Sequence, residues 1–175
     1  LVEENDRTEH DIGEYEKNIG KYVMMPGNAI KRHVVVEERL QKLTEYAENC
    51  PFNTVEMNSD EIGIITSGCS YLYVKEVLGD SVSILKIGMP YPLPVKLIKD
   101  FASNVKKLYV IEELDPIIEN HVKALGIEVI GKDAFTLQGE YSQSLIAKVI
   151  LGKDAEFMKA DVNIVPRPPV LCAGC

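Results

Sequence analysis

Cys172 and Cys175, the last two cysteines of the sequence, are the residues whose type and spacing most directly indicate chemistry. Two thiolates separated by two residues can ligate a metal ion or form a redox-active dithiol. Tetrahedral zinc sites and iron–sulfur clusters normally take four protein ligands, and the other cysteines, Cys50 and Cys69, stand singly in unrelated contexts. Cys172 and Cys175 are therefore candidate metal ligands, but the pair alone does not complete a site.

A thiol–disulfide role for the same pair rests only on its spacing, because reactive dithiols normally lie at the start of a helix. A proline-rich segment, Arg167-Pro168-Pro169-Val170-Leu171, leads directly into the two cysteines. The sequence opens at Leu1 instead of methionine and stops at Cys175, so we interpret it as an internal piece of a longer protein. On this interpretation the cysteines mark the entry to a further domain.

The turn Thr66-Ser67-Gly68-Cys69-Ser70 is a second candidate site. Hydroxyls and backbone amides at the start of a helix can hold an anion. The same residue types cap helices, and the turn lacks the lysine and the flanking glycines of a phosphate loop. Thr66, Ser67 and Gly68 are thus candidates for anion binding, with helix capping as the more common role of such residues.

Two further segments follow predicted strands. In residues 86–94 three prolines alternate with other residues and make a stiff loop, which loses little entropy when it docks against a partner. The loop is either an interface for a partner domain or subunit, or a rigid crossover without a partner. The sequence favours neither interpretation over the other. Glu112 and Glu113 follow the apolar residues 108–111. Because neighbours in an extended segment point to opposite faces, capping or ion pairing is favoured over a catalytic carboxylate pair.

The three histidines, His10, His33 and His121, lie far apart in the sequence and lack ligand spacing with any cysteine. We expect His10 to be solvated and the other two to be partly buried packing residues. The sequence contains no Ser-His-Asp order and no His-Glu-x-x-His motif. No catalytic residue is therefore predicted.

With 175 residues, 46% of them apolar, the chain is long enough for one ordinary domain with appended segments. A net charge of −8 and the absence of a basic cluster argue against nucleic acid as a partner. No apolar run approaches the roughly 20 residues that cross a bilayer, and no signal segment opens the chain. Unpaired cysteines are typical of a reducing compartment, so we expect a cytoplasmic location without membrane contact.

Short apolar runs alternate with helical patterns from residue 53 onward. The runs are too continuous for strands with one solvent-exposed face, and they occupy residues 62–66, 82–87, 108–111 and 127–130. Apolar residues at helical spacing occupy residues 71–78, 94–103, 116–125 and 142–151. This alternation predicts right-handed crossovers, and hence a three-layer α/β/α fold with a mostly parallel sheet of four to five strands.

Three segments are expected along the chain. Residues 1–52 would form a connecting arm and a helix that begins at His33 and ends before Pro51. Residues 53–152 would form the α/β domain. Residues 153–175, rich in proline, would form an extended linker into a missing cofactor domain.

Local signals also predict the helix ends within the domain. Asp115 is expected to cap the helix that Pro116 opens. Pro94 is expected to open its helix in a similar way. Gly79 and Gly126 stand just past helix ends, where a left-handed residue is commonly needed.

Several stretches, met in order, resemble the alpha subunit of indolepyruvate ferredoxin oxidoreductase, a thiamine-diphosphate and iron–sulfur 2-oxoacid oxidoreductase family. They cover most of the chain from residue 53 onward, and their order makes the resemblance fairly specific. The matching stretches are Gly63-Ile64-Ile65-Thr66-Ser67-Gly68, Lys75-Glu76, Leu85-Lys86-Ile87-Gly88, Tyr91-Pro92-Leu93-Pro94, Ile111-Glu112-Glu113-Leu114, Gly139-Glu140 and Arg167-Pro168-Pro169-Val170-Leu171-Cys172-Ala173-Gly174-Cys175.

The resemblance implies that residues 53–152 form a domain like the carboxyl-terminal domain of transketolase. In that family, thiamine diphosphate and Mg are held by two flanking domains, and 4Fe-4S clusters in a ferredoxin-like tail carry electrons away. No cofactor is therefore expected on these 175 residues themselves. Ala173 stands where the cysteine motif of the family usually has proline, which leaves the ligand role of Cys172 and Cys175 open.

The family reaction, as the resemblance implies it, converts an aryl 2-oxoacid and coenzyme A into acyl-CoA while ferredoxin is reduced. A beta subunit, ferredoxin and neighbouring domains of the same chain would be the partners. The favoured hypothesis makes this chain the middle, scaffolding domain of such an enzyme, inactive by itself. The alternative is a non-enzymatic interaction module that docks a partner through its proline loop and its terminal proline-rich segment.

Overall fold

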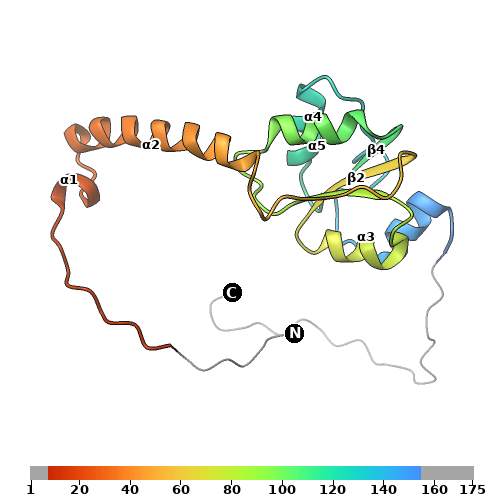
Figure 1. Cartoon of the computed structure of the whole chain (residues 1–175), viewed down its shortest axis with the longest axis horizontal. Coiled ribbons are helices and arrows are strands. Elements are labelled where there is room, and N and C mark those ends of the chain that lie inside the picture. Colours follow the sequence, from red (N-terminus) through yellow and green to blue (C-terminus); the bar gives the residue numbers. More distant parts are fainter. Residues whose placement is uncertain (1–7, 155–175) are drawn as a thin grey trace. The chain divides into compact units, whose positions relative to one another are not determined.

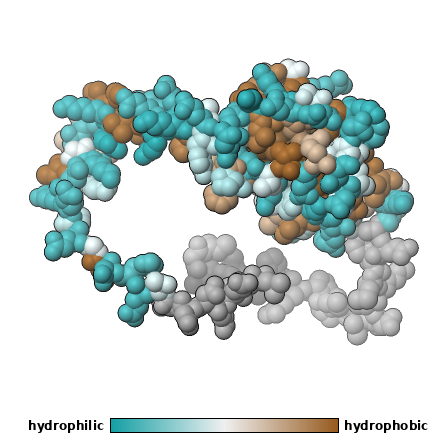
Figure 2. All heavy atoms as spheres, in the orientation of Figure 1, coloured by the Kyte–Doolittle hydropathy of each residue, from teal (hydrophilic) through white to brown (hydrophobic). Residues whose placement is uncertain are grey.

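The computed structural model describes residues 8–154 and divides the chain into two compact units, Leu1–Tyr46 and Ala47–Cys175. A short helix, α1 (Ile19–Tyr22), precedes the long helix α2 (Pro26–Ala47). Figure 2 shows that the surface of α2 is largely hydrophilic, with separate apolar groups along it. Across residues 8–154, no helix combines the length and the apolarity needed to span a membrane.

The start of α2 differs from the sequence prediction. The helix begins at Pro26, whereas the apolar pattern indicated His33. Proline suits the first turn of a helix, but the residues that follow it, Gly27 and Asn28, carry no apolar pattern, so periodicity missed this turn. The expected division of the chain after residue 52 stays a prediction.

A four-stranded sheet forms the centre of the second unit, in the order β1-β3-β2-β4. β2 (Ile62–Ser67) pairs in parallel with β3 (Ser83–Ile87) and with β4 (Lys107–Ile111). These three strands were predicted, and the mostly parallel α/β fold is confirmed. At one edge β1 (Thr54–Glu56) adds to β3 in the antiparallel sense. It was not predicted, because three residues are too few for a periodic signal.

The fourth predicted strand, residues 127–130, is reduced to one parallel bridge between Tyr109 and Ile130. Ile130 makes two backbone hydrogen bonds with β4, of 2.9 and 3.0 Å. Directly afterwards the chain turns at Gly131, whose backbone passes against the carboxylate of Glu119. The ladder therefore stops after a single residue.

Helices cover both faces of the sheet, which gives the three predicted layers (Figure 1). Successive strand residues face opposite layers: Ile64 and Ile84 pack on the side of α3, and Ile65 and Leu85 on the side of α4 and α5. Both faces are thus buried, which accounts for the continuous apolar runs. The helices are α3 (Ser70–Leu78), α4 (Val95–Ser103), α5 (Ile117–Ala124), α6 (Gln143–Ile146) and the π-helix η1 (Ala147–Leu151).

Glycines end several of these helices. Gly79 and Gly126 have φ values of 52° and 77°, so their predicted role is confirmed. The predicted helix at residues 142–151 is also present, but its second half is the π-helix η1. Gly152, with φ of 65°, ends it in the left-handed conformation.

Candidate functional site at the carboxyl edge of the sheet

A pocket of about 300 Å³ opens at the carboxyl edge of the sheet, where the neighbouring strands β2 and β4 end. The helices that follow them, α3 and α5, lie on opposite faces of the sheet. In parallel α/β sheets, ligands commonly bind where neighbouring strands diverge in this way. The pocket is lined by Ser67, Pro90, Glu112, Glu113, Leu114, Asp115, Ile117 and Ile118.

The pocket brings together the three segments that the sequence placed after strands. Ser67 is the last residue of β2, Pro90 follows β3, and the Glu112-Glu113 pair follows β4. The three segments therefore meet at one edge of the sheet. Sequence reasoning missed Leu114 and Ile117, two exposed apolar residues of the lining, because an apolar residue beside a helical pattern is normally assigned to the core.

Glu112 caps helix α5. Its carboxylate accepts hydrogen bonds from the backbone amides of Ile118 at 2.9 Å and Glu119 at 2.8 Å. The first amides of a helix lack partners within it, and the positive end of its dipole favours a carboxylate there. The prediction that Asp115 caps this helix is wrong. Pro116 occupies the N-cap position, and the side chain of Asp115 forms no hydrogen bond with any residue that the structure describes.

Glu113 accepts a hydrogen bond from the backbone amide of Tyr141 at 2.7 Å, so its partner differs from those of Glu112, although both residues line the pocket. The Tyr141 hydroxyl accepts a hydrogen bond from Lys132 Nζ at 2.8 Å and donates one to the carbonyl of Thr136 at 2.8 Å. Burial raises the pKa of Tyr141 to about 12, and burial also lowers the pKa of Lys132. These contacts tie the segment after residue 130 to the end of β4.

The anion-site candidates lie at the start of α3. Thr66 is fully buried, and its hydroxyl donates to the carbonyl of Ile111 at 2.8 Å. Ser67 lines the pocket, while Gly68 is exposed with φ of 57°. The side chain of the N-cap residue, Cys69, makes no capping hydrogen bond to α3. Anion binding at Thr66, Ser67 and Gly68 stays a prediction, and the Thr66 hydroxyl already has a structural partner.

The proline loop is held in place by contacts that the sequence did not indicate. Oδ1 of Asn53 accepts hydrogen bonds from the amides of Gly88 at 3.0 Å and Met89 at 2.9 Å, while its Nδ2 donates to the carbonyl of Ala47 at 2.9 Å. A Cβ on Gly88 would overlap the carbonyl oxygen of Phe52. These contacts support the interpretation of a stiff loop. Its use as an interface stays a prediction.

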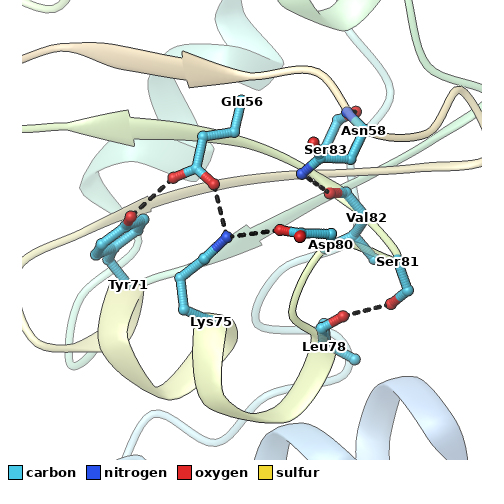
Figure 3. Close-up of polar contacts among 9 residues, drawn as sticks. All are labelled: Glu56, Asn58, Tyr71, Lys75, Leu78, Asp80, Ser81, Val82 and Ser83. Atoms are coloured by element: carbon cyan, nitrogen blue, oxygen red, sulfur yellow. Dashed lines mark hydrogen bonds and ion pairs between the residues drawn. The ribbon is translucent and has the colours of Figure 1, made fainter.

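A second polar cluster ties the edge strand β1 to α3 (Figure 3). The carboxylate of Glu56 accepts hydrogen bonds from the Tyr71 hydroxyl and from Lys75 Nζ, both at 2.7 Å. Lys75 also contacts Asp80 at 3.1 Å. The hydrogen bond from Lys75, which has the larger effect, and the one from Tyr71 hold the pKa of Glu56 below its ordinary value of 4.5. The Glu56 carboxylate in turn raises the pKa of Lys75.

Replacing Glu56 with glutamine is expected to lower the free energy of unfolding by about 1 kcal/mol at pH 7, because a charge-assisted hydrogen bond to Lys75 is lost. The pKa of Glu56 is depressed in the folded state, so its contribution is present above pH 4.5 and is lost as the pH falls through the folded value. In urea unfolding, the free energy of unfolding of Glu56→Gln should therefore be lower than that of the parent chain at pH 7. At about pH 3 the two free energies should be equal.

Glu61→Gln is the matched control, since Glu61 pairs with Lys106 on the exposed surface. Its effect should stay below about 0.5 kcal/mol at either pH. If the difference in unfolding free energy between Glu56→Gln and the parent chain were equal at both pH values, the stabilising role of the charged Glu56–Lys75 pair would be contradicted.

The histidines lie apart from the pocket lining. His10 is exposed, as predicted. His33 was expected to be partly buried, which is wrong: its side chain is 73% exposed on α2, with Nε2 3.3 Å from Glu37. His121 is partly buried, as predicted, and its Nε2 has no hydrogen-bond partner among the described residues.

The cysteines within the described residues also stand alone. Cys50 is buried and Cys69 is exposed, and both are free thiols. Between residues 8 and 154, no group of three or more His, Cys, Asp or Glu side chains is gathered so that it could hold a metal ion. Cys172 and Cys175, the candidate metal ligands, lie outside the described residues.

Comparison with known proteins agrees with the resemblance drawn from the sequence. No protein-family model matches the chain. The chain is 34% identical, over its whole length, to indolepyruvate oxidoreductase subunit IorA of Thermococcus kodakarensis and covers 31% of that protein. It is 36% identical, over 93% of its length, to subunit IorA of Archaeoglobus fulgidus and covers 29% of that protein. The chain thus spans about three tenths of the length of these curated relatives.

A solved structure supports the fold. The chain has a structural counterpart in the 2-oxoglutarate:ferredoxin oxidoreductase of Magnetococcus marinus, with a TM-score of 0.56 and 21% sequence identity. The match covers 74% of this chain and 24% of that one. At this identity the likeness concerns the fold alone.

Proposed function

We propose that this chain, which belongs by sequence to the family of indolepyruvate oxidoreductase subunit IorA, is the middle domain of such an enzyme. Its role would be to hold the neighbouring domains in position. The parent protein would oxidatively decarboxylate an aryl 2-oxoacid to acyl-CoA and reduce ferredoxin. Its partners would be a beta subunit, coenzyme A and ferredoxin. The chain itself would carry no catalytic residue.

One observation supports the scaffolding role above the others. Two of the carboxylates that line the pocket accept hydrogen bonds from backbone amides: Glu112 holds the first turn of α5 and Glu113 holds Tyr141. A carboxylate whose oxygens accept hydrogen bonds from backbone amides is held in a fixed position, which suits structural support. The polar groups of this edge therefore keep the loops in place.

The cofactors of the proposed parent enzyme do not fit the described residues. Thiamine diphosphate in this family is accompanied by Mg, which prefers carboxylate and carbonyl oxygens, and a 4Fe-4S cluster takes four thiolates. Residues 8–154 gather no such donor set. We assign the diphosphate, its metal and the clusters to other parts of the parent protein and derive no step of the reaction through this chain.

A chimera tests the proposal. The segment of Archaeoglobus fulgidus IorA that matches this chain would be replaced by residues 1–175 and combined with the partner subunit of that enzyme. Reduction of ferredoxin by indolepyruvate and coenzyme A should persist at no less than about a tenth of the original rate, a barrier change of about 1.4 kcal/mol. A flexible linker of the same length in place of the segment is the control and should abolish the activity.

Two results would oppose the proposal. The first is a folded, cofactor-loaded chimera that is no more active than the linker control. The second is tight binding of thiamine diphosphate and Mg to the 175-residue chain by itself, measured by calorimetry. Either result would place this chain outside a scaffolding role.

A further inference from the structure

We infer that the carboxyl edge of the sheet docks a segment of another polypeptide that carries basic side chains among apolar ones. The docking surface consists of Pro90, Tyr91, Leu114 and Ile117 together with the carboxylates of Glu113 and Asp115. The inference rests on the proposed scaffolding function and deepens it, since it names the surface and the chemistry of the partner.

The apolar side chains of the docking surface are unusually open to solvent. Tyr91 is 74% exposed, Leu114 66% and Ile117 68%. Pro90, Leu114 and Ile117 line the same pocket, and Tyr91 follows Pro90 in the loop. Exposed apolar residues gathered around a concavity, unlike single ones scattered over a surface, are typical of interaction sites.

Leu114 carries backbone strain as well. Its φ of 59° makes it the one residue other than glycine with positive φ in the described part of the chain. A bulky L-residue in this conformation costs on the order of 1 kcal/mol relative to glycine, and such strain is commonly found where structure serves function. An exposed leucine at this position gains nothing from burial within the chain, so a contact made outside the chain gives it a role.

The frame beneath the docking surface is rigid. Glu112 fixes the first turn of α5 just beyond Leu114, and Glu113 is bonded to Tyr141 on the other side. Asn53 fixes the loop that carries Pro90 and Tyr91 through the amides of Gly88 and Met89. Because the side chains are held before a partner arrives, little ordering entropy is lost on binding.

Charge selects the partner. Glu113 and Asp115 flank Leu114, and no ion pair joins either carboxylate to a cation of residues 8–154, although Lys132 attracts both at longer range. The chain as a whole carries a net charge of −8. A segment that combines arginine or lysine with apolar side chains would therefore meet complementary charge at the rim and apolar surface at the centre.

Labelled peptides test this inference on the 175-residue chain. The probe is a short peptide in which arginine alternates with leucine, and the two comparison peptides replace arginine by glutamate or leucine by serine. The arginine–leucine peptide should bind at least about tenfold more tightly than either comparison peptide, since each of them lacks one of the two contacts. Amide shifts in NMR spectra should concentrate on residues 91, 113–115, 117 and 118, since Pro90 and Pro116 have no amide hydrogen.

Variants separate binding from folding. Leu114→Gly removes the apolar contact and also relieves the positive φ, so it should weaken binding about tenfold without any loss of stability. Asp115→Asn should weaken binding a few-fold and reduce its salt dependence. Leu137→Gly, which alters an exposed leucine that does not line the pocket, is the matched control and should bind as the parent chain does.

The inference is overturned if the three peptides bind alike, if the amide shifts map elsewhere, or if Leu114→Gly binds the arginine–leucine peptide as well as the parent chain. The chimera assay is independent of these measurements. If the chimera still reduces ferredoxin but the arginine–leucine peptide does not bind, the docking surface is refuted while the scaffolding role stands.

Discussion

Replacing Glu112 with alanine is expected to lower the free energy of unfolding by about 3 kcal/mol. Glu112 as a residue is 7% exposed, and its carboxylate accepts two amide hydrogen bonds from the first turn of α5. Alanine would remove both charge-assisted bonds and leave two backbone amides without partners in a setting that water scarcely reaches. Urea unfolding followed by far-ultraviolet circular dichroism measures the loss.

Asp115→Ala is the matched control for Glu112→Ala. Asp115 precedes α5 directly and looks like its cap in the sequence, yet its carboxylate lies free of the helix amides. Its substitution should change the free energy of unfolding by less than about 0.5 kcal/mol. Equal losses for the two variants, or a larger loss for Asp115→Ala, would show that Glu112 is not the cap.

The same pair of residues shows what a sequence can reveal about helix caps. A cap is normally sought next to the helix, and Asp115 followed by Pro116 fits that pattern. In the structure the first turn of α5 is capped from the end of β4, by Glu112. In the same way α4 is capped from outside by Glu48, which accepts the amides of Lys96 and Leu97 at 2.9 Å each. Sequence distance hides such caps, because only the fold brings the carboxylate to the helix.

The sheet was easier to predict than its edges. β2, β3 and β4 are buried on both faces, so each appears in the sequence as a continuous apolar run. β1 is an edge strand of three residues, two of them exposed, and produces no such run. Residues 127–130 are apolar enough to be taken for a strand, but Gly131 turns the chain after one bridge.

The location of the candidate site was predictable, while its chemical character was not. Parallel strands end at one edge, so the loops after them had to meet, and Ser67, Pro90 and Glu113 do line one pocket. The sequence could not show that Glu112 is engaged by a helix or that Leu114 is held at positive φ with its side chain in solvent. Those properties depend on how the loops turn once they leave the sheet.

Replacing Gly88 with alanine is expected to destabilise the second unit by about 3 kcal/mol, at the upper end of the cost of overpacking. A Cβ at this position would overlap the carbonyl oxygen of Phe52 and lie 2.8 Å from its Cβ. Backbone cannot move aside as a flexible side chain can, so the loop would have to shift and break the Asn53 bonds to Gly88 and Met89. Thermal and urea unfolding measure the loss.

Gly27→Ala is the control for Gly88→Ala, because a Cβ on Gly27 meets nothing within 4 Å and lies in helix α2. Alanine there favours the helix by up to about 1 kcal/mol and should leave the unfolding of the second unit unchanged. NMR adds a local measure: in Gly88→Ala the amide of Met89 should lose the shift that its bond to Asn53 confers, together with the amides around Pro90 and Tyr91. Wild-type stability and an unmoved Met89 amide in Gly88→Ala would contradict the close approach of Phe52, and with it the rigid frame on which the docking surface depends.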